Sequence, residues 1–186
     1  MDLIVEEGFD GLTMPKLAVR VGVAVGGLYR YFPSKTDLLV ALQVRAVEQL
    51  GDWFEGASAS PGREGVEQIV LSVESFSRNH RTSFALLELA VSDPRRLLSL
   101  TQVEEVERAL QPVLARVGRR LEEAVVRGEL RSGDTIQRTY VLWGLAFGCL
   151  HLRKRDGALP EPLHAAQLLQ EGLRATLDGW GPARTS

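Results

Sequence analysis

Residues 8–35 read GFDGLTMPKLAVRVGVAVGGLYRYFPSK, a stretch in which glycine and proline separate short apolar segments. Apolar residues recur at helical spacing over residues 14–21 and again over residues 25–32. Gly22 lies between the two segments and predicts a tight turn. Two short helices joined by such a turn are typical of a helix-turn-helix, whose second helix enters the major groove of DNA.

The expected inner face of this motif is apolar. On the first helix we expect Leu17, Ala18 and Val21 to face inward, and Ala18 is small enough to let the two helices cross closely. On the second helix we expect Val23, Leu28 and Phe32 to face inward. These side chains would form a small core.

The expected outer face of the second helix is slim at its start and polar beyond it. Val25, Gly26 and Gly27 suit a groove about 12 Å wide, because small side chains let the helix approach the base edges. Tyrosine hydroxyls and basic side chains on either side can hold phosphates. The alternatives are that the tyrosines pack in the small core and that Lys35 is an ordinary solvated lysine. The residues that we expect to contact DNA are Thr13, Lys16, Val25, Gly26, Gly27, Tyr29, Arg30, Tyr31 and Lys35.

Charge is unevenly distributed along the chain. The 186 residues carry a net charge of -2 and the pI is about 6.0, which argues against a protein that coats nucleic acid over its whole surface. Residues 13–46 nevertheless contain five basic residues and one acidic residue, a net charge of +4. A local cationic face on a near-neutral protein is typical of a discrete anion-binding module.

Helical spacing continues to the end of the chain, and no segment alternates as a strand would. We predict an all-α fold of about nine helices, beginning with a short helix over residues 2–7. Ser34 and Asp134 are placed to cap later helices. We expect the last two helices to cover residues 134–155 and 162–178.

The order of residues over positions 8–39 is more specific than the helical pattern. It contains Gly-Phe-Asp, a threonine at a helix start, Leu-Ala, Gly-Val, Gly-x-Leu-Tyr-x-Tyr-Phe, Ser-Lys and Asp-Leu-Leu. This order resembles the TetR family of bacterial one-component transcriptional regulators. The resemblance implies an all-helical dimer with a three-helix DNA-binding domain, here residues 1–45, and a ligand-binding and dimerisation domain, here residues 46–186. The family's usual DNA contacts fall on Thr13, Val25, Gly26, Gly27, Tyr29, Tyr31 and Lys35.

Three positions depart from the family pattern. Only residues 1–7 precede Gly8, where the family has a full first helix and a basic arm, so either the true start lies upstream or the domain contacts less DNA. Ala24 replaces the usual Ser or Thr cap, which costs about 1 kcal/mol of helix stability. Gly27 replaces the usual Thr, Ser or Ala and lowers helix propensity by up to about 1 kcal/mol. The alternative function is therefore a helical small-molecule-binding dimer that has lost operator binding.

The helix expected around residues 140–150 is apolar almost all round, so the chain's own core covers only part of it. Gly144 and Gly148 are four residues apart, a spacing that permits close helix packing, although two glycines tolerated in a buried helix are the alternative. We expect this helix and the last one to form a four-helix bundle with their symmetry mates, so that a homodimer binds a palindromic operator. The expected interface residues are Gly144, Gly148, Leu169, Leu173, Thr176 and Leu177.

The middle helices carry apolar residues from which we predict a pocket for a small effector. Core packing is the alternative role at each position, because apolar stripes at helical spacing are first of all core. His80, at a helix end, is the best polar candidate, and capping is its alternative role. The predicted pocket residues are Val73, Phe76, His80, Phe84, Leu87, Leu110, Val113, Trp143 and Phe147.

Other classes of function find no support in the sequence. Cys149 is the only cysteine, which excludes an intrachain disulfide and a CxxC metal site. The histidines, His80, His151 and His164, form no metal or catalytic motif, so we expect no enzyme, no metal and no cofactor. No apolar run approaches the roughly 18 residues of a membrane span, and the N-terminus lacks a signal-peptide pattern, so we expect a cytoplasmic protein that contacts no membrane.

Together these patterns predict a ligand-responsive DNA-binding transcriptional regulator. We expect a repressor that binds operator DNA as a homodimer and is released when a small, largely apolar effector enters the C-terminal domain. The effector would act by changing the separation of the two recognition helices, since half-sites lie one helical turn, about 34 to 36 Å, or a multiple of it apart.

Overall fold

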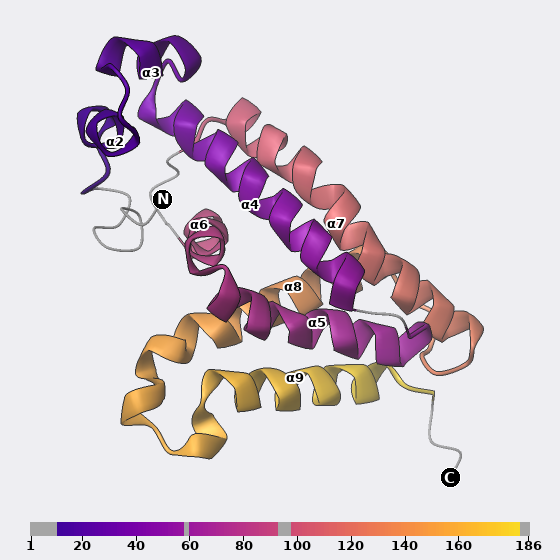
Figure 1. Cartoon of the computed structure of the whole chain (residues 1–186). Coiled ribbons are helices and arrows are strands. Elements are labelled where there is room, and N and C mark those ends of the chain that lie inside the picture. Colours follow the sequence, from indigo (N-terminus) through magenta and orange to yellow (C-terminus); the bar gives the residue numbers. More distant parts are fainter. Residues whose placement is uncertain (1–10, 58–59, 93–97, 183–186) are drawn as a thin grey trace. The chain divides into compact units, whose positions relative to one another are not determined.

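The computed structural model describes residues 11–57, 60–92 and 98–182 of the chain. Within these ranges the regular structure is helical and there is no strand (Figure 1), which confirms the all-α prediction. The short helix expected over residues 2–7 lies outside the described residues. The α-helices are α2 (Met14–Val21), α3 (Val25–Tyr31), α4 (Lys35–Ala57), α5 (Gly62–Asn79), α6 (Arg81–Ser92), α7 (Leu100–Val126), α8 (Thr135–His151) and α9 (Ala165–Trp180). Two 3₁₀ helices, η1 (Leu152–Ala158) and η2 (Glu161–Leu163), connect α8 to α9.

The chain divides into two compact units. The N-terminal unit comprises Met1–Gln49 and His80–Leu110, and the C-terminal unit comprises Leu50–Asn79 and Gln111–Ser186. The chain passes between the units at three points. Two of them fall within helices, since α4 and α7 each contribute residues to both units, and the third lies between α5 and α6. The expected domain boundary after residue 45 also falls within α4, and it stays a prediction.

Helix starts follow local signals in the sequence. The Thr13 hydroxyl accepts a hydrogen bond of 3.3 Å from the backbone N–H of Lys16 and caps α2. The Asp134 carboxylate accepts one of 2.9 Å from the N–H of Gln137 and caps α8, as expected. Gly22 ends α2 with φ 72°, a left-handed conformation that glycine adopts without strain. These contacts span only a few residues, which is why the sequence predicts them.

In the N-terminal unit, α2 and α3 pack against each other. Ala18 and Leu28 are buried, as expected, and Leu17 and Phe32 are half-buried. Val21 and Val23 are exposed, which corrects the expected inner face. The reason is the left-handed turn at Gly22, because side chains beside such a turn no longer follow the helical period.

In the C-terminal unit, α5, α8 and α9 pack together. One side of α8 is buried, whereas the side that carries Val141, Gly144 and Gly148 is exposed. The last helices are shorter than expected: α8 ends at His151, and α9 begins at Ala165. The intervening residues form tighter 3₁₀ turns instead. At the start of α9 the N–H of Ala165 donates a hydrogen bond of 3.0 Å to the Asp156 carboxylate.

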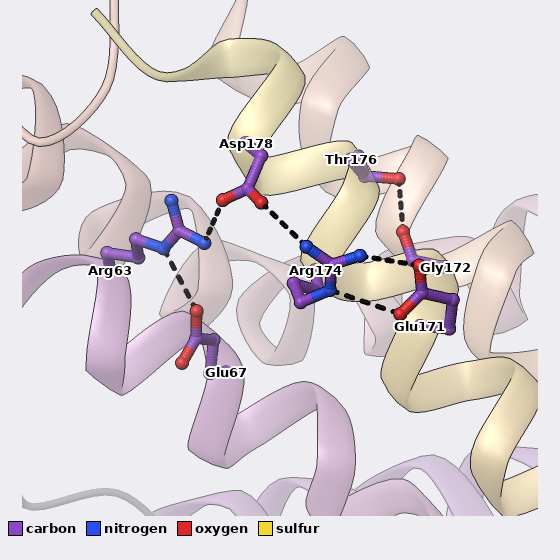
Figure 2. A network of polar contacts seen from close by, with 7 residues as sticks. All are labelled: Arg63, Glu67, Glu171, Gly172, Arg174, Thr176 and Asp178. Carbon is purple, nitrogen blue, oxygen red and sulfur yellow. Dashed lines mark hydrogen bonds and ion pairs between the residues drawn. The ribbon is translucent and has the colours of Figure 1, made fainter.

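Charged side chains join the start of α5 to the end of α9 (Figure 2). The Arg63 guanidinium donates to Glu67 at 2.9 Å and to Asp178 at 2.6 Å. Arg174 donates to the same Asp178 at 3.3 Å and to Glu171 at 2.6 Å. The network therefore links two segments of the C-terminal unit that are far apart in the sequence.

Candidate nucleic-acid interface

Helix α3 is held by one buried side chain and by the turn before it. The N–H of Val23 donates to the carbonyl of Ala18 at 3.0 Å, which closes the turn between α2 and α3. Leu28 is the buried residue of α3. The rest of the helix is therefore left for contacts outside the small core.

The tyrosines of α3 lie on its exposed surface. Tyr29 is 46% exposed and Tyr31 is 70% exposed, so neither packs in the core, which removes the alternative role considered for them. The Arg30 guanidinium lies 5.3 Å from the centre of the Tyr31 ring, a cation–π contact that orients both side chains. These three consecutive residues present two hydroxyl groups and one positive charge to the outside.

The first turn of α3 is slim for a reason that lies outside the chain's own packing. A Cβ atom added to Gly26 or Gly27 would meet no atom within 4 Å, so no neighbouring side chain requires glycine there. Ala24, at the N-cap, provides no side-chain hydrogen bond, as its residue type predicts. The helix nevertheless forms, and its start leaves open space around its backbone.

The other expected DNA contacts flank α3 in the sequence. Thr13 is exposed at the start of α2. The Lys16 ammonium is also exposed and donates to the carbonyl of Gly11 at 3.3 Å. Lys35 is the first residue of α4 and is half-buried. The structure thus places all nine expected residues on the N-terminal unit, and their contact with DNA stays a prediction.

Asp37 is the only acidic residue of residues 13–46, the basic segment of the chain, and polar contacts hold its carboxylate. The Ser34 hydroxyl donates to it at 2.7 Å and the Gln102 amide at 2.8 Å, and these hydrogen bonds lower the pKa of Asp37. The Ser34 hydroxyl in turn accepts from the N–H of Asp37 at 3.1 Å, the cap predicted for α4.

The link from Asp37 to α7 was not predicted. Gln102 and Ser99 form a reciprocal cap at the start of α7. The N–H of Ser99 donates to the Gln102 amide oxygen at 3.0 Å, and the N–H of Gln102 donates to the Ser99 hydroxyl at 3.3 Å. The spacing Ser-x-x-Gln signals such a cap in the sequence. Nothing in the sequence indicates that the remaining Gln102 amide N–H group reaches Asp37, because the two residues are 65 positions apart.

The predicted pocket residues are mostly core side chains of their own units. In the C-terminal unit, Trp143 is half-buried, and the centroid of its ring lies 4.1 Å from the centroid of the Phe147 ring. Val73 and Trp143 line a cavity of about 20 Å³, which has room for about one water molecule. The buried residues are Val73, Phe76, Val113 and Phe147 in the C-terminal unit and Phe84, Leu87 and Leu110 in the N-terminal unit.

His80 is half-buried in the N-terminal unit. Its carbonyl accepts from the N–H of Phe84 at 2.9 Å at the start of α6. The backbone of His80 therefore caps the start of α6, which is the alternative role considered for this residue. Effector binding by its side chain stays a prediction.

A larger groove, which the sequence does not indicate, lies between α7 and α8 of the C-terminal unit. Its volume is about 430 Å³. Ile136 and Tyr140 of α8, both exposed, form part of its wall. The other lining residues are Gln111, Leu114, Ala115, Gly118, Arg119, Glu122, Thr135 and Thr139.

The expected dimer residues separate into two groups. Gly144 and Gly148 are exposed, and a Cβ added to either would meet no atom within 4 Å. Leu169, Leu173 and Leu177 are at most 2% exposed, so they pack inside the chain and do not face a partner. This corrects the expectation, and the reason is that α9 has a single apolar stripe, which its own unit needs for the core.

Thr176 takes part in a contact within α9. It is half-buried, and its hydroxyl donates to the carbonyl of Gly172 at 2.7 Å. Gly172 itself packs closely on Leu145 of α8. Of the two helices α8 and α9, it is α8 that carries the exposed large apolar side chains, Ile136, Tyr140 and Val141.

The comparisons with known proteins agree on one family. Residues 1–42 match the family described as bacterial regulatory proteins, tetR family. The HTH-type transcriptional repressor KstR of Rhodococcus jostii (strain RHA1) is 38% identical over 71 residues, which are 38% of this chain and 32% of KstR. Residues 1–42 of the chain therefore belong to the TetR family.

Other similarities of this chain extend the comparison. The nucleoid occlusion factor SlmA of Actinobacillus pleuropneumoniae serotype 5b (strain L20) is 35% identical over 77 residues, 40% of this chain and 38% of SlmA. The chain thus matches only about a third of the length of these curated relatives. The structure of the transcriptional regulator FadR from Bacillus subtilis, in complex with stearoyl-CoA, has a TM-score of 0.75 at 19% identity and covers 96% of this chain and 94% of FadR. This likeness concerns the fold.

Among the residues described, no three metal-binding side chains gather as a metal ion would require. None of the helices in the same described part of the chain combines the length and apolar character needed to cross a membrane.

Proposed function

We propose that this chain is a transcriptional regulator, a repressor that binds a palindromic operator as a homodimer and leaves it when a small, largely apolar effector binds. The observation that carries the proposal is the exposed surface of α3. Its start is slim, and Tyr29, Arg30 and Tyr31 follow on the outside, within the basic segment of a family of DNA-binding regulators. No chemical reaction is needed for this function.

The DNA-binding domain of the proposal is residues 1–45. Helix α3 enters the major groove, and α2 crosses the backbone. Thr13, Lys16 and Lys35 hold phosphates on either side, together with the hydroxyl groups of the tyrosines. Because phosphate contacts release counterions, the affinity falls steeply as salt is added.

Dimerisation belongs to residues 46–186 in the proposal, and the exposed face of α8 supports it. This face carries Gly144 and Gly148 beside Tyr140 and Val141. Apolar surface without a partner is costly in water, and glycines allow a second helix to come close. A symmetric pair of such faces gives a two-fold axis, and a two-fold protein reads a palindrome.

The effector acts on a closed core in the proposal. The cavity at Val73 and Trp143 holds about 20 Å³, so an effector must displace side chains to enter. Such a displacement moves helices of the C-terminal unit and changes the separation of the two recognition helices in the dimer. The Bacillus subtilis FadR structure contains stearoyl-CoA, which makes acyl-CoA esters the first compounds to test.

The test is a fluorescence-anisotropy titration of labelled duplexes from a random library after rounds of selection, at salt concentrations from 50 to 200 mM. We expect enriched palindromic duplexes, a complex of two chains of 20.5 kDa each, and a steep loss of affinity with salt. No complex at low salt, from a chain that is folded and dimeric, would support the alternative of a ligand-binding dimer without an operator.

A further inference from the structure

We propose that Val25 selects a thymine in each operator half-site by contact with its 5-methyl group. The inference rests on the proposed DNA-binding function and adds to it the chemistry of one base pair. It starts from the residues at the beginning of α3, because the N-terminal residues of a recognition helix are those that contact base edges.

Val25 is the only residue with a side chain beyond the backbone in the stretch Val25–Gly27. The residue after this stretch, Leu28, is buried in the core of the N-terminal unit. The first turn of α3 therefore presents only the isopropyl group of Val25 and bare backbone to a base pair.

The surroundings of Val25 leave this group accessible. Val25 is 36% exposed as a residue, at the start of the helix. At Gly26 and Gly27 an added Cβ would point into open space, so no side chain of the first turn stands between Val25 and an approaching duplex. The tyrosines and Arg30 follow later in the helix and supply the polar contacts.

The chemistry of the major groove then selects the base. Each base pair presents hydrogen-bond donors and acceptors in that groove, and the one apolar group among them is the C5 methyl of thymine. An isopropyl group cannot replace the water molecules on a polar base edge, and a desolvated polar group without a partner is costly. Thymine is thus the base whose edge Val25 complements.

The test removes the methyl group and nothing else. In a duplex selected by the wild-type protein, each thymine is replaced in turn by deoxyuridine, and affinities are measured by anisotropy. We expect one position per half-site at which the replacement weakens binding by about fourfold, the effect of one methyl group withdrawn from an apolar contact. In Val25→Ala the same replacement changes the affinity little, because the contacting methyl groups of the protein are absent.

Two controls separate the contact from folding and from base pattern. Alanine favours the helix more than valine does, so Val25→Ala keeps α3. Val19→Ala alters a valine of α2 that is 82% exposed, and it keeps the full deoxyuridine effect. At the sensitive position, a 5-methylcytosine·guanine pair binds wild type about fourfold tighter than cytosine·guanine, because only the methyl group differs.

Each outcome is decisive. A deoxyuridine effect that disappears in Val25→Ala but persists in Val19→Ala supports the inference. Specific binding with no sensitive thymine, or with equal sensitivity in Val25→Ala, overturns the inference and leaves the proposed function standing. The absence of any enriched duplex overturns both.

Discussion

Helices α3 and α9 use their side chains in opposite ways. Leu28 is the buried residue of the seven in α3, whereas α9 buries Ala165, Leu169, Leu173 and Leu177 along one stripe. Most helix stability in proteins comes from packing an apolar face, so the core holds α9 firmly and holds α3 by little more than one leucine. The difference teaches that the exposed residues of α3 contribute little to folding and are available to a partner.

Leu173→Ala tests whether the apolar stripe of α9 is part of the core. We expect a loss of roughly 2 to 5 kcal/mol in the free energy of unfolding, because a buried leucine leaves a cavity when it is truncated. The measurement is urea unfolding followed by circular dichroism, at one protein concentration because dimers gain stability by mass action. Leu163→Ala, at an exposed leucine of η2, is the matched control, with an expected change within about 0.5 kcal/mol. Equal losses in the two variants would show that the stripe is not core.

The exposed face of α8 is tested by Gly144→Glu. A carboxylate at a symmetric helix contact meets its own copy, and such like charges cost several kcal/mol, so we expect the dimer to dissociate at least about a hundredfold more readily. Sedimentation equilibrium measures the dissociation, and circular dichroism checks that the chain stays helical. Gly56→Glu places the same charge at an exposed glycine near the end of α4 and should leave the dimer intact. A dimer unchanged by Gly144→Glu would place the interface elsewhere.

Tyr29→Phe and Tyr31→Phe test whether the exposed residues of α3 serve DNA binding and not folding. Each change removes one hydroxyl from an exposed ring, so we expect unchanged stability and operator affinity weaker by about tenfold, the effect of a lost hydrogen bond to a charged phosphate. Ser132→Ala removes an exposed hydroxyl group of the C-terminal unit, outside α3, and should leave the affinity as it is. If the α3 variants bind like wild type, these hydroxyl groups contact no phosphate.

The smallest expected effect concerns pH and the start of α5. The Glu129 carboxylate accepts from the N–H of Arg63 at 2.8 Å and from the Arg127 guanidinium at 2.7 Å, and these contacts lower its pKa. A carboxylate whose pKa is lowered by folding stabilises the protein above its ordinary pKa of 4.5 and loses that contribution as the pH falls through the folded value.

Glu129→Gln should therefore be less stable than wild type at pH 7 and converge with it as the pH falls below the pKa of Glu129 in the folded protein. Thermal unfolding over this pH range measures the difference. Glu122→Gln, an exposed position on α7, is the control and should follow wild type throughout. A constant difference between Glu129→Gln and wild type at all pH values would mean that the charge of Glu129 has no part in capping α5.

Local features of the fold were predictable from the sequence to the extent that they depend on neighbouring residues. The cap at Thr13 and the turn at Gly22 each involve contacts across a few positions. The exposure of Tyr29 and Tyr31 could also be predicted, since the apolar side chains nearby suffice for a small core. The contact between Asp37 and Gln102 could not, because it joins positions 65 apart.

By itself, the sequence determined that the chain is helical, where most helices begin, and that residues 8–39 form the TetR-like motif, because caps, glycines and the 3.6-residue period act over one or two turns. Only the tertiary structure decided that Leu169, Leu173 and Leu177 face the chain's own core, that Val21 and Val23 remain exposed, and that the cavity at Val73 and Trp143 is so small. An apolar stripe indicates that a face will be covered, but which segment covers it depends on packing among residues that are distant in the chain.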